Sequence, residues 1–554
     1  MGPGDVPLTL TELLTSSRPA PGATVGRSRV QPPPSWWFVV VPAVFVAVFF
    51  FWPLLTILAR GLSPEGLALL GRASTWRILG FTTWQALLST LLTVAVGLPA
   101  AYALHRLAFR GRRTLLVLLT VPFVLPTVVV GTAFRALLPQ AWAGTLGAIL
   151  LAHVFFNLAV VVRVVGGLWA HLDERYAQAA RTLGATPVTV WRTVTWPLLR
   201  PAVLAASALV FLFTFTSFGV IVVLGGPATT TIEVEIYRRT VALFDLRGAA
   251  ALCVLQLVCV VGVLLVSGRL QRRLAVRQRL GRAQSSLHRA RSVGDRAIVW
   301  YVWVLGALVA APMLALLHDS LRVGDGYGFE WWQRLGREGT TTRDVTVWES
   351  ARVSLSYAVV AMLIAVVVGG LAACAIAYAR RGGDAVDSAF TLPLGTSAVT
   401  VGFGLLITFA AAPLDLRGTW IIVPIGQALV AVPLVVRLVL PVLRSIDPRL
   451  REAAATLGSS PARTWRTVDL PVLGRALGVG AGFAAAVSLG EFGATSFLAR
   501  TSAPTLPVEI ARLMGRPGEA STGQAAALSV VLVVLTGLVV VLVERWRQPG
   551  GGAL

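Results

Sequence analysis

The sequence predicts an all-α polytopic membrane protein with about twelve transmembrane helices, arranged as two parallel repeats of six helices. Hydrophobic residues make up 56% of the 554-residue chain and charged residues only 13%, which is outside the usual range of soluble domains. The apolar residues gather in runs of about 20, long enough to cross a bilayer. Backbone polar groups must be satisfied internally in hydrocarbon, and runs this long and this apolar predict helices rather than barrel strands.

Arginine distribution sets the expected orientation of these runs. The runs cover residues 36–59, 80–104, 114–134, 143–170, 201–225, 247–268, 297–318, 354–379, 388–412, 419–443, 476–499 and 524–543. If the chain starts inside, the inner segments hold about 30 arginines and the outer segments about 16, the direction of the positive-inside rule. We therefore expect a multi-pass membrane protein with both termini in the cytoplasm.

The net charge of +23 does not indicate a nucleic-acid partner, because the basic residues are dispersed among the loops between the runs. All 48 basic residues are arginine, and the chain contains no lysine. The cysteines Cys253, Cys259 and Cys374 lie inside apolar runs without the spacing of metal ligands. No catalytic residue, metal or cofactor is expected.

An internal duplication relates the two halves. When segment 173–199 is aligned without a gap to segment 447–473, 14 of the 27 positions are identical. Chance pairing at ordinary composition would give roughly two or three identities. This alignment, which pairs Asp173 with Asp447 and continues at the same offset along the chain, is called the repeat register below. Because each unit holds an even number of spans, the repeats are parallel and related by an axis along the membrane normal.

The duplication also predicts the organisation of the chain. A segment with nine arginines and one acidic residue separates the halves and is expected to be a cytoplasmic linker. The predicted parts are a disordered cytoplasmic tail (1–35), a first half (36–268) with a long inner loop (171–200), the linker (269–296), a second half (297–543) with a matching loop (445–475), and a cytoplasmic tail (544–554).

Both long inner loops are expected to form a helix, a turn and a second helix. In the first loop, Gly184 can take the left-handed conformation that ends a helix, Thr186 can cap the next helix, and Pro187 suits its first turn. The second loop places the same kinds of residue at the corresponding positions: Gly458, Ser460 and Pro461.

These loops resemble the EAA loop of permeases in binding-protein-dependent ABC importers. The second loop reads Glu452-Ala453-Ala454, then Gly458, then Val468-Asp469-Leu470-Pro471. It departs from the family motif only at Val468, where the motif has isoleucine. The first loop reads Gln178-Ala179-Ala180, then Gly184, then Val194-Thr195-Trp196-Pro197, with glutamine for glutamate and tryptophan for leucine. The resemblance covers both halves and implies the type I permease fold.

The resemblance implies that both loops dock on a cytoplasmic ATPase, expected to be a dimer, and carry its motion to the pore. The coupling residues expected from it are Gln178, Ala179, Ala180, Gly184, Pro197, Glu452, Ala453, Ala454, Gly458 and Pro471. Because Gln178 lacks the charge of Glu452, the two loops are expected to grip the ATPase unequally. A P-loop needs a lysine, so ATP hydrolysis is assigned to the partner and not to this chain.

The choice of substrate rests only on resemblance to known permeases. An extracytoplasmic binding protein is expected to deliver it. The segment that begins Leu224-Gly225-Gly226-Pro227 is similar to thiamine importer permeases, which share their overall plan with iron(III) permeases. Ser488-Leu489-Gly490-Glu491-Phe492-Gly493-Ala494 and Thr505-Leu506-Pro507 fit both groups. Thiamine is favoured over iron(III), while sulfate, molybdate and polyamine are more distant alternatives.

One carboxylate lies at membrane depth. Glu491 falls inside the eleventh run, opposite Ser217 in the repeat, and both are candidate residues of the substrate pathway. An ionisable group there is costly and faces protein or water, so Glu491 either lines the substrate pathway and attracts a cation or hydrogen-bonds to a neighbouring helix. An ion-coupled secondary transporter is the main alternative class, but it needs more mid-membrane ionisable groups than Glu491 and His153.

Overall fold

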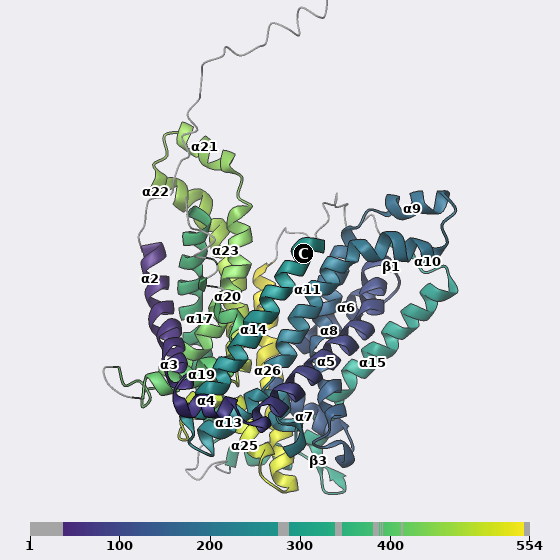
Figure 1. The fold of residues 1–554 in the computed structure, drawn as a ribbon. Helices are drawn as coiled ribbons and strands as arrows, with labels where there is room; N and C mark the ends of the chain where they lie inside the picture. Colours follow the sequence, from purple (N-terminus) through teal and green to yellow (C-terminus); the bar gives the residue numbers. More distant parts are fainter. Residues whose placement is uncertain are drawn as a thin grey trace, which may run out of the picture. The chain divides into compact units, whose positions relative to one another are not determined.

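The computed structural model describes residues 37–274, 287–337, 346–379, 387, 389–390, 392–410 and 414–547. The predicted tail 1–35, the middle of the linker and the last residues of the chain lie outside these ranges. By its internal contacts the chain divides into two units, and the described part of the smaller unit is 446–471. Figure 1 shows the helices of both units.

Most of the described residues of the first half are helical. Its elements are α2 (Trp37–Val46), η1 (Ala47–Phe51), α3 (Trp52–Gly61), α4 (Pro64–Leu70), α5 (Ala73–Arg106), β1 (Leu107–Ala108), α6 (Arg112–Leu118), η2 (Val121–Val124), α7 (Thr127–Leu137), η3 (Gln140–Trp142), α8 (Leu146–His171), α9 (Glu174–Thr182), α10 (Pro187–Val190), η4 (Trp191–Thr195), α11 (Trp196–Phe215), α12 (Gly219–Leu224), η5 (Pro227–Thr229), α13 (Ile232–Val241) and α14 (Leu246–Leu274).

The elements of the linker and the second half come next. They are β2 (His288–Arg289), α15 (Val293–Leu321), β3 (Arg322–Val323), β4 (Gly326–Tyr327), α16 (Glu330–Arg337), α17 (Val347–Tyr378), η7 (Leu392–Gly395), α19 (Ala398–Thr408), α20 (Ile422–Arg444), α21 (Pro448–Thr456), α22 (Pro461–Thr464), η8 (Trp465–Asp469), α23 (Leu470–Gly490), α24 (Thr495–Leu498), α25 (Leu506–Met514) and α26 (Glu519–Arg547).

The all-α polytopic fold is confirmed, but the third span of each half departs from an unbroken helix, as does the fifth span of each half, which is described below. Ten helices in the described part of the chain are long and apolar enough to cross a membrane. The predicted run 114–134 is instead two helical pieces, Arg112–Val124 and Thr127–Leu137, bent by 111°. Leu125, which precedes Pro126, is extended (φ −70°, ψ 141°), because a proline disfavours helical backbone in the residue before it.

The second departure repeats the first. In the predicted run 388–412 the apolar helix is α19, which has only 11 residues. A short 3-10 turn, η7, precedes α19, just as η2 precedes α7. The spacing between the starts of η7 and α19 equals the spacing between the starts of η2 and α7. The break is therefore part of the duplicated unit. Hydropathy alone misses it, because the broken segments remain apolar.

Small residues allow the longest helices of each half to pack closely. A Cβ atom added to Gly97 on α5 would lie 2.8 Å from the Cβ of Val161 on α8. A Cβ added to Gly369 on α17 would lie 2.9 Å from the Cβ of Val435 on α20. Close helix approach through small residues is the usual source of packing energy between membrane helices, where lipid competes for apolar contact.

The two halves exchange their first spans. Helix α15, the first of the second half, packs against α5, α6 and α7 of the first half and against α26 (Figure 1). The first span of the chain packs against α17 and α19 of the second half through α2 and α3, and against α14. Each half is thus completed by a helix from the other, which the sequence alone did not predict.

Candidate functional site

The first inner loop has the predicted helix–turn–helix form. Asp173 caps α9 by accepting a hydrogen bond from the Arg175 N–H, and no residue of α9 is buried. Gly184 ends this helix with φ at +83°, in the left-handed region. Thr186 then accepts a hydrogen bond from the Thr189 N–H and caps α10.

The second inner loop repeats this local structure residue by residue. Asp447 caps α21, Gly458 has φ at +76°, and Ser460 caps α22. A π-helical turn follows in both loops, η4 in the first and η8 in the second. Each element of the second loop begins at the residue that the repeat register pairs with the start of its counterpart. The turn and cap residues predicted from the sequence are therefore confirmed.

The paired alanines close the turn at the end of each motif helix. The carbonyl of Ala180 accepts from the Ala185 N–H at 3.0 Å, and the carbonyl of Ala454 accepts from the Ser459 N–H at 3.0 Å. This is the six-to-one bond of a Schellman ending, which requires a left-handed residue inside it. The alanines therefore hold the turn through their backbone while their small side chains leave the outer surface of the helix open.

The side chains expected to meet the ATPase are open to solvent. Gln178, Ala179, Glu452 and Ala453 are all exposed. Neither Gln178 nor Glu452 makes a side-chain hydrogen bond or ion pair with any residue that the structure describes. These positions are free to contact a partner.

The two prolines of the motif have a different place. Pro197 lies in the first turn of α11, directly after the π-helical turn. Pro471 is the second residue of α23, again directly after such a turn. The backbone is helical without a break at both places, so each proline lies where a π-helical turn passes into an α-helix inside one long helix, Pro187–Phe215 or Pro461–Gly490.

Sequence reasoning did not single out two leucines that are the most exposed large apolar side chains of the described residues. Leu183 and Leu457 are each 88% exposed, and each precedes the left-handed glycine of its loop. The repeat register pairs them, and they are among the identical positions, which is the signal that could have identified them. A solvent-exposed leucine at the same place in both loops indicates an interaction surface.

The fifth span of each half is interrupted, and the two predicted pathway residues lie at the interruptions. Helix α11 ends at Phe215 and α12 begins at Gly219, with Ser217 between them. Helix α23 ends at Gly490 and α24 begins at Thr495, with Glu491 between them. The repeat register places Ser217 opposite Glu491, and both are buried.

Glu491 is bound by the turn that follows it. Its carboxylate accepts hydrogen bonds from the Ala494 N–H at 2.7 Å, the Thr495 N–H at 2.9 Å and the Thr495 hydroxyl at 2.5 Å. These donors satisfy a buried carboxylate without a counter-ion. Of the two interpretations left open by the sequence, this geometry favours the hydrogen-bonding one, with a partner turn in place of a neighbouring helix.

Ser217 takes part in a buried polar line across the first half. His153 on α8 contacts the Ser217 hydroxyl through Nε2 at 2.9 Å and the Ser89 hydroxyl through Nδ1 at 3.0 Å. Gln427, which the repeat register pairs with His153, reaches the Thr495 hydroxyl at 3.5 Å. In both halves a polar side chain of the fourth span thus fixes the interruption in the fifth.

The interruptions bring two paired rings into contact across the halves. Phe218 and Phe492, related by the repeat register, stack with centroids 5.1 Å apart and an interplanar angle of 16°. Both rings are buried. Gly219 follows the first ring, and a Cβ there would lie 2.3 Å from the Thr127 Oγ1 of α7. The start of α12 therefore fits against α7 only because residue 219 has no side chain.

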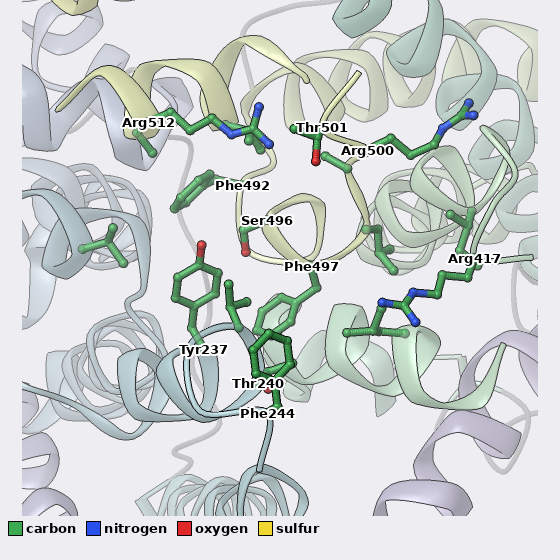
Figure 2. A pocket seen from close by; sticks show the side chains of 18 residues that line it. Tyr237, Thr240, Phe244, Arg417, Phe492, Ser496, Phe497, Arg500, Thr501 and Arg512 are labelled. Atoms are coloured by element: carbon green, nitrogen blue, oxygen red, sulfur yellow. The ribbon is translucent and has the colours of Figure 1, made fainter. Parts of the chain in front are cut away.

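A cavity of about 730 Å³ opens beside this ring pair (Figure 2). Its walls include the aromatic side chains of Tyr237, Phe244, Phe492 and Phe497. Three arginines also line it: Arg417, Arg500 and Arg512. No described aspartate or glutamate lines it, although Arg512 pairs with the buried Glu509 carboxylate at 3.6 Å. Neither Glu491 nor Ser217 is among the lining residues.

The cavity wall also has two local features. Burial raises the pKa of the Tyr237 phenol, while the charge of Arg512 acts in the opposite direction. Phe244 is 79% exposed at the cavity and has φ at +54°, a conformation that is costly for a bulky residue. Strain of this kind often marks a binding region.

Glu491→Gln is expected to lower the stability of the protein and to leave its affinity for substrate unchanged. A glutamine has one acceptor oxygen, so at least one N–H of the turn would lose its partner, at a cost of about 1–3 kcal/mol. The thermal midpoint of the purified protein and the KM of uptake separate the two interpretations. Glu519→Gln is the control, since the Glu519 carboxylate accepts one exposed bond from the Gly324 N–H.

A raised KM with an unchanged thermal midpoint would instead assign Glu491 to the attraction of a cation.

Within the described residues no group of three or more histidines, cysteines or acidic residues is arranged to hold a metal ion.

Known proteins similar to this chain are transport permeases. A family model described as binding-protein-dependent transport system inner membrane component matches residues 93–279. The thiamine transport system permease protein of Escherichia coli K12 is 28% identical over 500 residues, covering 85% of this chain and 89% of that protein. The molybdenum transport system permease protein of Mycobacterium bovis is 34% identical over 243 residues, covering 41% of this chain and 90% of that protein.

A solved structure, of a bacterial ABC transporter involved in the import of the acidic polysaccharide alginate, covers 44% of this chain and 96% of its own, with a TM-score of 0.39 and 15% identity.

Proposed function

This chain belongs to the inner membrane components of binding-protein-dependent transport systems, the permeases of ABC importers, and we propose that it forms the complete permease of a thiamine importer. In this proposal a separate ATPase dimer binds both inner loops from the cytoplasm, where both termini also lie. A substrate-binding protein delivers thiamine from the other side. The chain hydrolyses no ATP, because it has no lysine for a P-loop.

The observation that carries this proposal is the recurrence of one exposed loop structure at matching positions of the two halves. A connection between spans needs only two to eight residues, yet these loops keep the same caps, left-handed glycine and exposed leucine. Two copies on one chain suit a partner with two equivalent binding sites. An ion-coupled transporter gives no reason for such loops, which supports the ABC assignment.

Thiamine is favoured as the substrate for two reasons. Relatives named for thiamine transport match 85% of this chain or more, so the likeness spans both halves. The aromatic walls of the cavity also suit a flat heteroaromatic ring, which can stack on or meet the edges of Tyr237, Phe492 and Phe497.

The three cavity arginines favour a second candidate, a small oxyanion. A guanidinium group binds oxyanions through paired hydrogen bonds and repels a cation such as thiamine. The relative named for molybdenum transport matches this chain over 243 residues at 34% identity. Thiamine and molybdate therefore have to be compared directly in one uptake assay.

The test is uptake into proteoliposomes that contain the purified chain. With the ATPase and binding protein of the same transporter, we expect ATP-dependent accumulation of labelled thiamine, and competition by unlabelled thiamine but not by molybdate. The chain alone is expected to bind no ATP and to hydrolyse none. ATP turnover by a preparation free of other subunits would refute the proposal, and accumulation of molybdate alone would transfer it to the oxyanion.

A further inference from the structure

The last residues of the linker are attached to the first half before the chain enters the second half. Strand β2 pairs with β1 in parallel, so that His288 lies opposite Leu107 and Arg289 opposite Ala108. Strand β1 directly follows α5, and β2 precedes α15 by only a few residues. The connection between the halves is thus fixed to the inner end of α5.

The same end of α5 holds the first helix of the first inner loop. Arg106, the last residue of α5, pairs with the Glu174 carboxylate at 2.5 Å. The Arg106 guanidinium also donates to the carbonyls of Trp169 and Leu172 at 3.3 and 3.2 Å. Glu174 is the first residue of α9, and the His288 ring nitrogen Nδ1 lies 3.8 Å from its carboxylate. The end of the linker and the loop helix therefore meet at one carboxylate.

A tyrosine on α5 connects this cluster to the first span of the second half. The Tyr102 hydroxyl donates to the Asp295 carboxylate at 3.1 Å, in the first turn of α15. Further along α15, the Tyr301 hydroxyl donates to the carbonyl of Val96 at 2.8 Å. Two bonds thus fix α15 to α5 along its inner part.

Aromatic contacts complete the connection. The Tyr102 ring lies 5.2 Å from the ring of Trp169, and the Trp169 ring lies 5.5 Å from that of Trp191. Trp191 begins the π-helical turn of the first loop. Tyr102 therefore contacts, directly or through one ring, both the loop and the first span of the second half.

Among the residues that the structure describes, the second half does not repeat this cluster. The repeat register places Pro448 where Glu174 stands and Leu443 where Trp169 stands. Pro448 cannot form the ion pair of Glu174, and Leu443 cannot form the ring contacts of Trp169. The cluster belongs to the first loop alone and exists because the two halves are joined in one chain.

We propose that residues 287–296 form a strut that ties the first inner loop to α15, so that movement of this loop acts on both halves. Tyr102 and Glu174 are positioning residues of the strut. The inference rests on the proposed function, since it assumes that an ATPase moves the loop. It predicts that weakening the strut lowers the amount of substrate imported per ATP without preventing folding or ATPase binding.

The first test measures ATP hydrolysed per substrate imported in the full reconstituted transporter. Tyr102→Phe and Glu174→Gln keep shape and remove one hydrogen bond or one charge, and each is expected to raise the ratio by about three- to tenfold. Glu330→Gln is the matched control, because it removes an ion pair of 2.7 Å with Arg334 on α16, away from the loop. Wild-type ratios in both strut variants would overturn the inference.

The second test locks the strut. Leu107→Cys with His288→Cys, in a background where Cys253, Cys259 and Cys374 are replaced, allows a disulfide between β1 and β2. If the strut stays intact through the cycle, the oxidised protein imports substrate at the rate of the reduced protein. Loss of uptake on oxidation, restored by reduction, would show that the segments separate and would refute the strut. Failure of the unmodified transporter to use ATP would count against the proposed function instead.

Discussion

Gly458→Val is expected to reduce ATP-dependent uptake at least tenfold while the protein still inserts into the membrane. Gly458 holds φ at +76°, and a β-branched side chain costs about 1–3 kcal/mol in this region. A Cβ at this position meets no atom within 4 Å, so the backbone alone is strained and no core contact is lost. The turn would relax and redirect α21, which carries Glu452.

Two controls isolate the effect of the turn. Gly458→Asn should keep most uptake, because asparagine tolerates the left-handed region. Gly474→Val should also be mild, since Gly474 lies in α23 outside the positive-φ region and its Cβ also meets no atom within 4 Å. Normal uptake by Gly458→Val at wild-type protein level would mean that the turn does not orient the motif helix.

Leu183→Ser and Leu457→Ser are together expected to abolish stable binding of the ATPase. Burial of a leucine in an interface contributes about 1.5–3 kcal/mol, so each change should weaken binding by roughly one to two orders of magnitude. Both side chains are 88% exposed in the chain alone, so the changes should leave its own stability unaffected.

The measurement is the dissociation constant of the complex between the ATPase and the detergent-solubilised chain, for the wild type and for the double variant. Leu62→Ser is the control, a leucine that is 55% exposed between α3 and α4. If the double variant binds the ATPase as tightly as the wild type, the exposed leucines are not part of the docking surface.

The local structure of the loops could be predicted from the sequence because it depends on short-range chemistry. A glycine that ends a helix, followed by a hydroxyl cap and a first-turn proline, specifies its own backbone in either loop. The same holds for most spans, whose length and apolar composition are read directly. The functional roles of Gln178 and Glu452 stay predictions, since they concern a partner.

The features that could not be predicted depend on contacts between distant segments. The sequence places Glu491 at membrane depth, but the donors that satisfy it appear only when the helix is interrupted before Thr495. The exchange of α15 between the halves and the pairing of His288 with Leu107 leave no periodic signal. Neither contact can be predicted from the local sequence pattern.

If one chain is a complete permease with two coupling loops, it binds two ATPase subunits by itself. The mass of the purified complex with its ATPase tests this most directly, because the number of ATPase subunits per chain follows from the mass alone. We expect one copy of this chain with two ATPase subunits. A complex of one ATPase subunit per chain, or of two copies of this chain with two ATPase subunits, would contradict the proposed organisation.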